Sequence, residues 1–400
     1  MVTFTRPSTR LRGAGRRLGR VAVDMVDSGR QTYDYAVPLC RDGDSLGHVE
    51  RARLILAAGL DELVLGVFRG VRTPDPEVMT ASLREAGTLV EYLDRTGVLA
   101  DPVSYHEPPR VPSLDWTARR VAHRSFEHVT FKSPYTPDAS VPGAARYAEQ
   151  TGNELAHAWV LHQSEPAPWL VCVHGAGMGD PLVDLVMFRA AALHRRGFNV
   201  AIPVLPHHGP RGAGRFQVAF PSADLAGNLH GTAQAIADVR AVLAYIADRQ
   251  EPAALHGISL GGYVAAAVAA LEPSIAAVVA GVPLVDIAQV FETHAARRDP
   301  DDGHLSALVE LVRPLEAVGS PIALGRPATA VRRIYAGRAD RFVHPEQVER
   351  LVEHWGVDAS WYSGGHLGFM RSAVARQCID DALVEGGIAR RDDDGVVAVC

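Results

Sequence analysis

A serine between two glycines is the first residue whose type and spacing suggest chemistry. Ser259 stands in the pattern Gly-x-Ser-x-Gly with Gly257 and Gly261, after the apolar run AAL and before the helical run YVAAAVAAL. A serine on a tight strand-to-helix turn adopts an unfavourable backbone conformation, and only small neighbours let the strand and the helix pack around it. The start of the helix also favours negative charge near that serine. The pattern predicts a nucleophile, and a glycine-rich turn in which Ser259 caps the helix is the alternative.

An acid and a base follow the serine along the chain. Asp340 lies just after the apolar run VRRIYAG, and His366 directly follows the run ASWYSGG. A carboxylate that accepts the Nδ1 proton of an imidazole holds the ring as a general base. Taken singly, Asp340 could cap a helix and His366 could be a surface residue. Because nucleophile, acid and base each follow a predicted strand, together they favour a Ser-His-Asp triad.

The elements that must position these residues begin near residue 124. From there, short apolar runs that end in glycine, proline or serine alternate with helical patterns, the longest over His230–Arg249. Fully apolar strands that alternate with helices predict a parallel sheet covered on both faces. Ligand sites in such sheets lie at the carboxyl ends of the strands, which is where Ser259, Asp340 and His366 are expected.

On these motifs, residues 124–385 resemble the α/β-hydrolase superfamily, and they look most like serine esterases of the dienelactone-hydrolase and acyl-peptidase kind. The resemblance implies an α/β class with the α/β-hydrolase fold. This fold is a mostly parallel, doubly wound sheet of about eight strands with helices on both faces. The resemblance also implies hydrolysis through an acyl-enzyme intermediate, with no cofactor and no metal ion.

A fourth motif agrees with this resemblance. The segment Val171–Met178 looks like the His-Gly loop that follows the third strand in the superfamily. The resemblance implies that the backbone N–H of Ala176 pairs with that of Leu260, the residue after the nucleophile, to form an oxyanion hole. Each such donor lowers the barrier by a few kcal/mol. His174 is then a structural residue that holds the loop.

Other polar residues near the same edge leave alternatives open. His207, His208 and Arg211 follow the run NVAIPVLP, and they are either candidate substrate-binding residues or a scaffold for their loop. Two adjacent histidines without a nearby carboxylate make a poor metal site. Asp286 is the fallback acid, because some α/β-hydrolases take their acid from the loop after the preceding strand. The pattern G-x-x-D-x-x-V-x-x-E around Asp340, which looks like that of the superfamily, favours Asp340.

The same patterns divide the chain into segments. Residues 1–20 are a basic tail that we expect to be disordered. Residues 21–123 are expected to form a helical N-terminal extension, which either covers the active site or makes a homodimer contact. Residues 124–388 form the hydrolase domain, in which 285–328 is a small cap insert, and residues 389–400 are a C-terminal tail.

Composition argues against several other classes of protein. The 400 residues are 47% hydrophobic and 22% charged, as in globular and not in disordered chains. A net charge of −6 gives no reason to expect nucleic acid as a partner. The four cysteines form no CxxC pair, and the arginine-rich N-terminus lacks the apolar segment of a secretory signal, so we expect a cytoplasmic protein. The uncharged stretch Pro252–Leu271 is long enough to cross a bilayer, but we predict a buried strand, turn and helix there and no integral membrane segment.

These observations favour a carboxylic ester hydrolase that acts on a small-molecule ester or acyl substrate. A peptidase or a C–C bond hydrolase would use the same residues. A non-catalytic, hydrolase-like binding protein is the alternative from another class. We prefer the esterase because esters are the more reactive substrates and because the sequence shows no sign of a peptide groove.

Overall fold

The computed structural model describes residues 48–71, 76–212, 220–295 and 303–399. The expected tail over 1–20 and the first part of the expected extension lie outside the described residues. The main sheet has nine strands in the order β1-β2-β3-β5-β4-β6-β7-β8-β9. Its strands are β1 (Asp115–Val121), β2 (Arg124–Lys132), β3 (Leu155–Leu161), β4 (Trp169–Val173), β5 (Asn199–Val204), β6 (Ala253–Ile258), β7 (Ala277–Gly281), β8 (Arg332–Gly337) and β9 (Ala359–Tyr362).

Strand direction divides this sheet into two parts. β1, β2, β3 and β5 pair antiparallel, whereas the strands from β5 to β9 pair parallel. The predicted mostly parallel sheet is therefore confirmed. In its parallel part Val173 of β4 lies opposite Gly257 of β6, and Gly337 of β8 lies opposite Tyr362 of β9. The carboxyl ends of neighbouring strands thus open on the same edge of the sheet.

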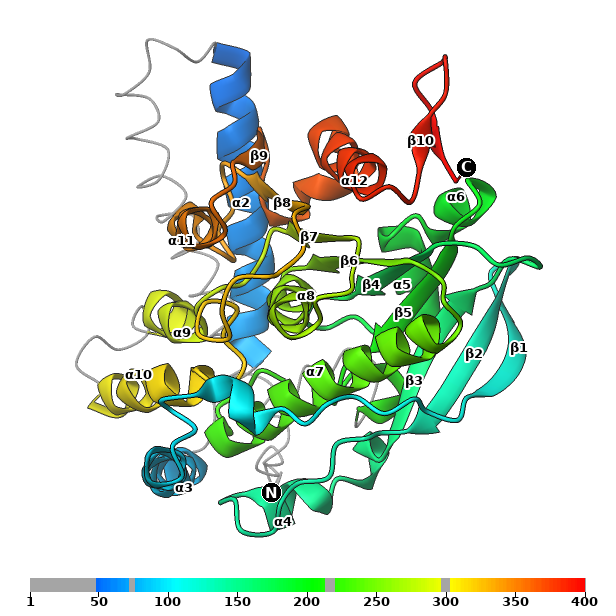
Figure 1. Cartoon of the computed structure of the whole chain (residues 1–400). Helices are drawn as coiled ribbons and strands as arrows, with labels where there is room; N and C mark the ends of the chain where they lie inside the picture. The colour runs from blue at the N-terminus through cyan, green and yellow to red at the C-terminus, as the bar shows by residue number, and fades with distance from the viewer. Residues whose placement is uncertain (1–47, 72–75, 213–219, 296–302, 400) are drawn as a thin grey trace, which may run out of the picture.

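Helices cover both faces of the sheet, as predicted (Figure 1). One core cluster joins apolar residues of β4, such as Val171, to α7, α8 and α11, and the other joins Leu170 and Cys172 of the same strand to α5, α6 and α12. This alternation along β4 is the period of two that a strand buried on both faces requires. The helices of the hydrolase domain are α4 (Ala144–Ala148), α5 (Pro181–Met187), α6 (Ala190–Arg195), α7 (Leu225–Asp248), α8 (Leu260–Leu271), α9 (Ile287–Ala295), α10 (Gly303–Glu316), α11 (Pro345–Trp355) and α12 (Ala373–Glu385).

The edge strand β1 corrects the expected helical extension, because residues 115–121 pair with β2 and do not form a helix. With β1 the sheet has nine strands, one more than the roughly eight that were expected. Six of its seven residues are exposed, so no apolar alternation marks it in the sequence. Its hairpin turn, Ala122-His123, has positive φ at both residues but lacks the Asn-Gly or Asp-Gly sequence typical of such turns.

Two helices of the N-terminal region pack onto the hydrolase domain. α3 (Pro76–Arg95) buries Ala86, Leu89 and Leu93 in the larger core cluster. α2 (His48–Val71), blue in Figure 1, runs past β8 and β9. Residues 285–328, the expected cap insert, contain α9 and α10, which pack against each other, and α10 also packs against α3.

Short elements complete the described chain. The C-terminal segment forms a small hairpin of β10 (Arg390–Arg391) and β11 (Val397–Ala398), and Val399 N–H donates to the carbonyl of Arg196 at 2.9 Å. Four 3₁₀ turns are η1 (Pro102–Tyr105), η2 (Thr151–Asn153), η3 (Gly209–Arg211) and η4 (His366–Met370). Within the described ranges, no helix has the length and apolar character needed to span a bilayer.

Candidate active site

The backbone at Ser259 has the strained geometry that the glycine pattern predicted. Ser259 links β6 to α8 with φ 55° and ψ −120°, a conformation that non-glycine residues rarely adopt. A Cβ added at Gly257 would overlap the carbonyl of Gly261, and a Cβ at Gly261 would overlap the carbonyl of Val173. Both positions therefore require glycine so that β4, β6 and α8 can approach one another.

Hydrogen bonds to the next loop fix the serine turn. Ser259 N–H donates to the carbonyl of Gly281 at 2.9 Å, and the carbonyl of Ser259 accepts from the N–H groups of Tyr263 and Leu284, both at 3.1 Å. These bonds tie the turn to both α8 and the end of β7. Strain of this kind persists only where the surrounding structure enforces it, and such strain is concentrated at functional sites.

The His-Gly loop after β4 lies directly beside the serine. A Cβ added at Gly175 would lie 3.3 Å from the Cβ of Ser259, so the backbone of this loop is in contact range of the serine side chain. Leu260 is the first residue of α8, where a backbone N–H has no acceptor within the helix. Ala176 is exposed in the adjacent turn. The loop and the helix start thus adjoin the serine from two sides.

Asp340 and His366 meet as the sequence predicted. His366 Nδ1 lies 2.7 Å from Asp340 Oδ2, and both side chains are buried. The second oxygen of Asp340 accepts hydrogen bonds from the N–H groups of Phe342 and Val343, each at 2.9 Å. These bonds fix the carboxylate, so it holds the imidazole with Nδ1 protonated and leaves Nε2 unprotonated in the neutral ring.

Electrostatics and stacking act together on the imidazole. Burial lowers the pKa of His366, but the charge of Asp340, its hydrogen bond and the charge of Asp61 outweigh burial, so the pKa is raised from its usual value. The ring of Phe342 stacks on the imidazole with the ring centres 4.8 Å apart and 20° between the planes. The base is therefore held from its edge and from one face.

The fallback acid lies in a different set of contacts. Asp286 Oδ2 pairs with Arg350 Nη1 at 2.7 Å, and Oδ1 accepts from the N–H of Gln289 at 2.6 Å, at the start of α9. Both carboxylate oxygens are thus used to fix α9 and α11. The structure favours Asp340 over Asp286 as the partner of His366.

Two roles were considered for the histidine-rich loop after β5, and the contacts of Arg211 favour the scaffold. Arg211 is buried, pairs with Asp238 at 2.7 Å, and also donates to the carbonyls of Val204 and Asn153. Both terminal nitrogens of its guanidinium are therefore used inside the fold. His207 N–H donates to Asn153 Oδ1 at 2.9 Å, and His208 Nδ1 lies 2.8 Å from the carbonyl of Pro206.

His174 holds the His-Gly loop after β4 through both of its ring nitrogens. Its Nε2 accepts from the N–H of Leu205 at 3.0 Å, so Nδ1 carries the proton and donates to the carbonyl of Gly175 at 2.8 Å. Burial lowers its pKa to about 3, and the neighbouring His208 and Arg211 lower it further. The ring is therefore neutral and joins the ends of β4 and β5.

Asp61 and Glu62 of α2 are residues at the site that the sequence reasoning did not identify. Asp61 Oδ2 accepts from the N–H of His366 at 2.7 Å. Asp61 falls on the buried face of α2, in step with Leu54, Ala58 and Leu65. The sequence did carry a signal, because Asp61 stands at a position of the helical pattern that apolar residues otherwise occupy. Buried carboxylates are rare unless they have a partner, so a carboxylate at such a position indicates a polar partner.

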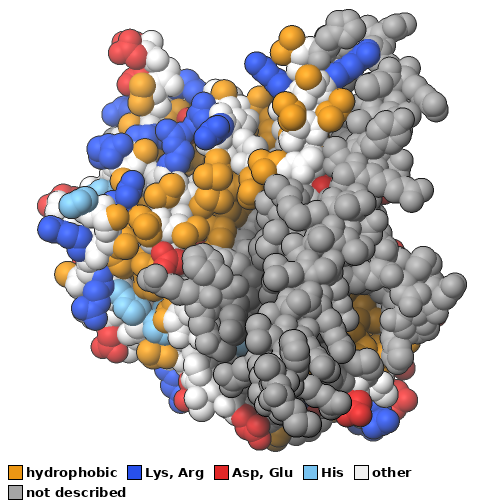
Figure 2. Space-filling view, turned by 180° about the vertical axis from the view of Figure 1, so that it is seen from behind, with side chains coloured by type: hydrophobic (Ala, Val, Ile, Leu, Met, Phe, Trp, Pro, Cys, Tyr) orange, Lys and Arg blue, Asp and Glu red, His pale blue; other side chains and the backbone are white. Residues whose placement is uncertain are grey.

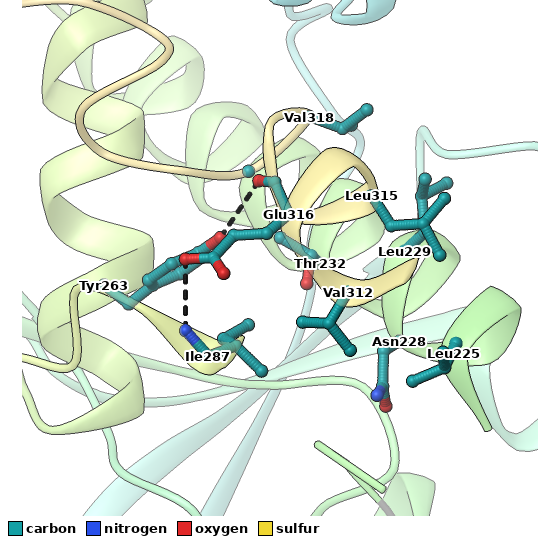
Figure 3. Close-up of a pocket in the computed structure, with 11 residues that line it drawn as sticks. Leu225, Asn228, Leu229, Thr232, Tyr263, Ile287, Val312, Leu315, Glu316 and Val318 are labelled. Carbon is teal, nitrogen blue, oxygen red and sulfur yellow. Dashed lines mark hydrogen bonds between the residues drawn. The ribbon is translucent and has the colours of Figure 1, made fainter. Parts of the chain in front are cut away.

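A small cavity lies between the cap insert and the helices α7 and α8 (Figure 3). It measures about 30 Å³ and is mostly apolar, with Tyr263, Thr232 and Glu316 as polar groups at its wall. A space of this size holds about two water molecules. The carboxylate of Glu316 accepts from the N–H groups of Ile287 and Ala288 at 3.1 and 3.3 Å, so it caps the start of α9.

Replacing Glu316 with Gln should make stability less dependent on pH. Burial raises the pKa of Glu316 to about 8, and the charge of Asp286 adds to this, from 4.5 in the unfolded chain. The folded state thus binds a proton that the unfolded chain loses, so the free energy of unfolding falls as the pH rises from 4.5 to about 8. Urea unfolding at pH 5.5 and pH 8 should show that Glu316→Gln loses less stability than the parent, by about 3 kcal/mol. Glu310→Gln, on an exposed site of the same helix, should follow the parent, and equal pH dependence of Glu316→Gln and the parent would contradict the expectation.

Exposed apolar residues lie on η4, which begins at His366, and on α5. Leu367 and Met370 of η4 and Leu182 and Val186 of α5 are exposed. Both elements pack into the core cluster on the α12 side of the sheet. Figure 2 shows hydrophobic side chains gathered on the face turned away from the viewer in Figure 1. Among the residues that the structure describes, no three His, Cys, Asp or Glu side chains gather as metal ligands.

Together, the strand order, the strained serine turn and the loops after β8 and β9 define an α/β-hydrolase fold. No family model matches the chain. The chain belongs to the same family as two proteins of Mycobacterium tuberculosis, "Uncharacterized protein MT2702" (strain CDC 1551 / Oshkosh) and "Uncharacterized protein Rv2627c" (strain ATCC 25618 / H37Rv). It is 39% and 38% identical to them over 353 residues, which cover 85% of this chain and 84% of each relative.

Among the solved structures with a similar fold are an acetyl xylan esterase and a puromycin-hydrolyzing peptidase. An acetyl xylan esterase from Paenibacillus sp. R4 is 16% identical with a TM-score of 0.48, over 73% of this chain and 93% of that one. A puromycin-hydrolyzing peptidase of Mycobacterium tuberculosis is 18% identical with a TM-score of 0.40, over 68% of this chain and 39% of that one.

Proposed function

We propose that the protein is a serine hydrolase, and more narrowly a carboxylic ester hydrolase. The observation that carries the proposal is the 2.7 Å pair of His366 and Asp340, which follow β9 and β8 at the same edge of the sheet as the strained turn of Ser259 after β6. This arrangement supplies a nucleophile, a base and an orienting acid at the carboxyl ends of the strands.

The proposed reaction has two steps. Ser259 Oγ attacks the acyl carbon while Nε2 of His366 takes its proton, and the protonated imidazole then gives that proton to the leaving alcohol. Water, activated by the same imidazole, then hydrolyses the acyl-enzyme and releases the acid. Asp340 stabilises the imidazolium through Nδ1. The backbone N–H groups of Ala176 and Leu260 bind the tetrahedral oxyanion.

Two other functions would use the same groups. A peptidase or a C–C bond hydrolase needs the same triad with a different pocket, and a panel of esters, amides and β-diketones separates the three activities. A hydrolase-like binding protein would keep the fold without an activated serine. A small-molecule substrate, a cytoplasmic location and a homodimer formed through the N-terminal region remain predictions.

Labelling by a fluorophosphonate should depend on Ser259. The probe reacts with serines whose proton is removed by a base, so the wild type should label and Ser259→Ala should not. Gel fluorescence measures the labelling, and Ser140→Ala, at an exposed serine, is the control that should label like the wild type. A folded wild type that does not label would favour the binding protein over the enzyme.

A further inference from the structure

The helix α2 makes its polar contacts with the two loops that carry the proposed acid and base. A single oxygen of Asp61, Oδ2, accepts from the N–H of His366 at 2.7 Å and from the N–H of Arg341 at 3.1 Å. His366 lies in the loop after β9, and Arg341 directly follows Asp340 in the loop after β8. One carboxylate oxygen thus links both loops.

The surroundings of Asp61 form a closed and complementary site. Asp61 is 1% exposed, and a Cβ added at Gly365 would lie 2.6 Å from its Oδ2, so glycine at 365 admits the carboxylate. The next residue, Glu62, is fully buried and pairs with Arg341 Nε at 2.9 Å. Apolar contacts of the same helix, from Leu54 and Ala58, reach Ala339 at the base of the acid loop.

Side chains join the two loops through His366 and Asp340, but the hydrogen bonds between the backbones of the loops lie near their bases. Arg338 N–H donates to the carbonyl of Tyr362, and Ala339 N–H donates to the carbonyl of Gly364, both at 3.0 Å. Beyond these bonds, the backbone N–H groups of Arg341 and His366 both turn to Asp61. The backbone of His366 is therefore anchored by α2, while its side chain is anchored by Asp340.

We infer that Asp61 is a positioning residue, which sets the backbone of His366 relative to the loop of Asp340, so that α2 completes the active site. The inference rests on the proposed function, since it assigns Asp61 to the same triad. It gives the N-terminal helix a role in the hydrolase reaction that α/β topology alone does not require.

The charges around Asp61 set the expected pH dependence. The groups that face it are Asp340 and Arg341 from the acid loop, His366 from the base loop and Tyr362 at the end of β9. Glu62, the next residue of its own helix, pairs with the same Arg341. Burial and the charge of Asp340 raise the pKa of Asp61 to about 6, whereas the N–H groups of His366 and Arg341 lower it. The charge of Asp61 contributes to the raised pKa of His366.

The test compares Asp61→Ala with Asp61→Asn, with Asp94→Ala, an exposed Asp on α3, as the control. Asparagine keeps an oxygen that can accept both N–H bonds but removes the charge, whereas alanine removes both bonds. The first measurement is the rate of fluorophosphonate inactivation as a function of pH. The second is hydrogen exchange of the amides of Arg341 and His366.

Asp61→Ala should inactivate about 10–100-fold more slowly than the wild type at its optimum pH, because a small displacement of a catalytic group costs about this much. The amides of Arg341 and His366 should also exchange faster in this variant. Asp61→Asn should keep the amide protection and label at close to the wild-type rate, with its acid limb moved to lower pH because the pKa of His366 falls. Asp94→Ala should match the wild type in every measurement.

Wild-type labelling rates in folded Asp61→Ala would overturn the inference, as would an Asp61→Asn variant that is as slow as Asp61→Ala. If Asp61→Ala fails to fold, wild-type amides of Arg341 and His366 that exchange as fast as unprotected amides overturn it. A wild type that does not label refutes the proposed function and the catalytic role of Asp61 with it. Unchanged amide exchange in Asp61→Ala refutes the link between the loops by itself, whatever the labelling shows.

Discussion

Asp340→Asn should lower the rate of ester hydrolysis by about 10³–10⁴-fold, whereas Asp286→Asn should leave it within about threefold of the wild type. The physical reason lies in the hydrogen bond at Nδ1 of His366, which Asp340 Oδ2 accepts at 2.7 Å. An amide at this position can present N–H to the ring, and then the neutral imidazole carries its proton on Nε2. That tautomer cannot accept the proton of Ser259.

The pH profile adds a second expectation for the same variant. The charge and the hydrogen bond of Asp340 both raise the pKa of His366, so Asp340→Asn should move the acid limb of the remaining activity to lower pH. In the wild type, activity should rise with pH as His366 loses its proton. The measurement is kcat/KM for a chromogenic ester from pH 5 to pH 9.

Asp286→Asn is the matched control, because Asp286 is the other carboxylate that follows a parallel strand and was weighed as the acid. Its oxygens contact Arg350 and the N–H of Gln289, so the substitution should affect the packing of α9 and not the imidazole. If Asp286→Asn lost the activity while Asp340→Asn kept it, the assignment of the acid would be wrong.

Gly261→Ala should destabilise the protein by about 4 kcal/mol or more, and Gly257→Ala should do the same. At each position the added methyl group overlaps a backbone carbonyl, that of Val173 for Gly261 and that of Gly261 for Gly257. A backbone carbonyl at the end of β4 or at the start of α8 cannot move aside as the end of a flexible side chain can. Urea unfolding followed by circular dichroism measures the loss.

Gly87→Ala is the control for the cost of adding a methyl group. Gly87 lies inside α3, where a Cβ would meet no atom within 4 Å. Because alanine favours the helix over glycine, this variant should be stabilised by about 0.5–1 kcal/mol. A Gly261→Ala variant as stable as the parent would show that β4, β6 and α8 do not approach as closely as the structure has them.

The sequence determined the parts of the site that depend on neighbouring residues. The glycines around Ser259 are needed locally, because the turn from β6 to α8 leaves no room for side chains at 257 and 261. Strand ends are marked by the change from apolar residues to glycine or proline, and this placed Asp340 and His366 at the correct edge. The apolar runs and the helical patterns between them were enough to predict a doubly wound sheet, because those patterns reflect burial on two faces.

Only the tertiary structure decided which distant polar groups meet. The exposed strand β1 buries too little apolar surface to leave a pattern, and its pairing with β2 defines it. Arg211 resembled a substrate ligand until the fold placed Asp238 beside it. Asp61 lies 305 residues before His366 in the chain, and no local rule connects a helical carboxylate with a backbone N–H so far away. Buried polar groups must find partners, but packing of the whole chain chooses those partners, so their identity is absent from local patterns.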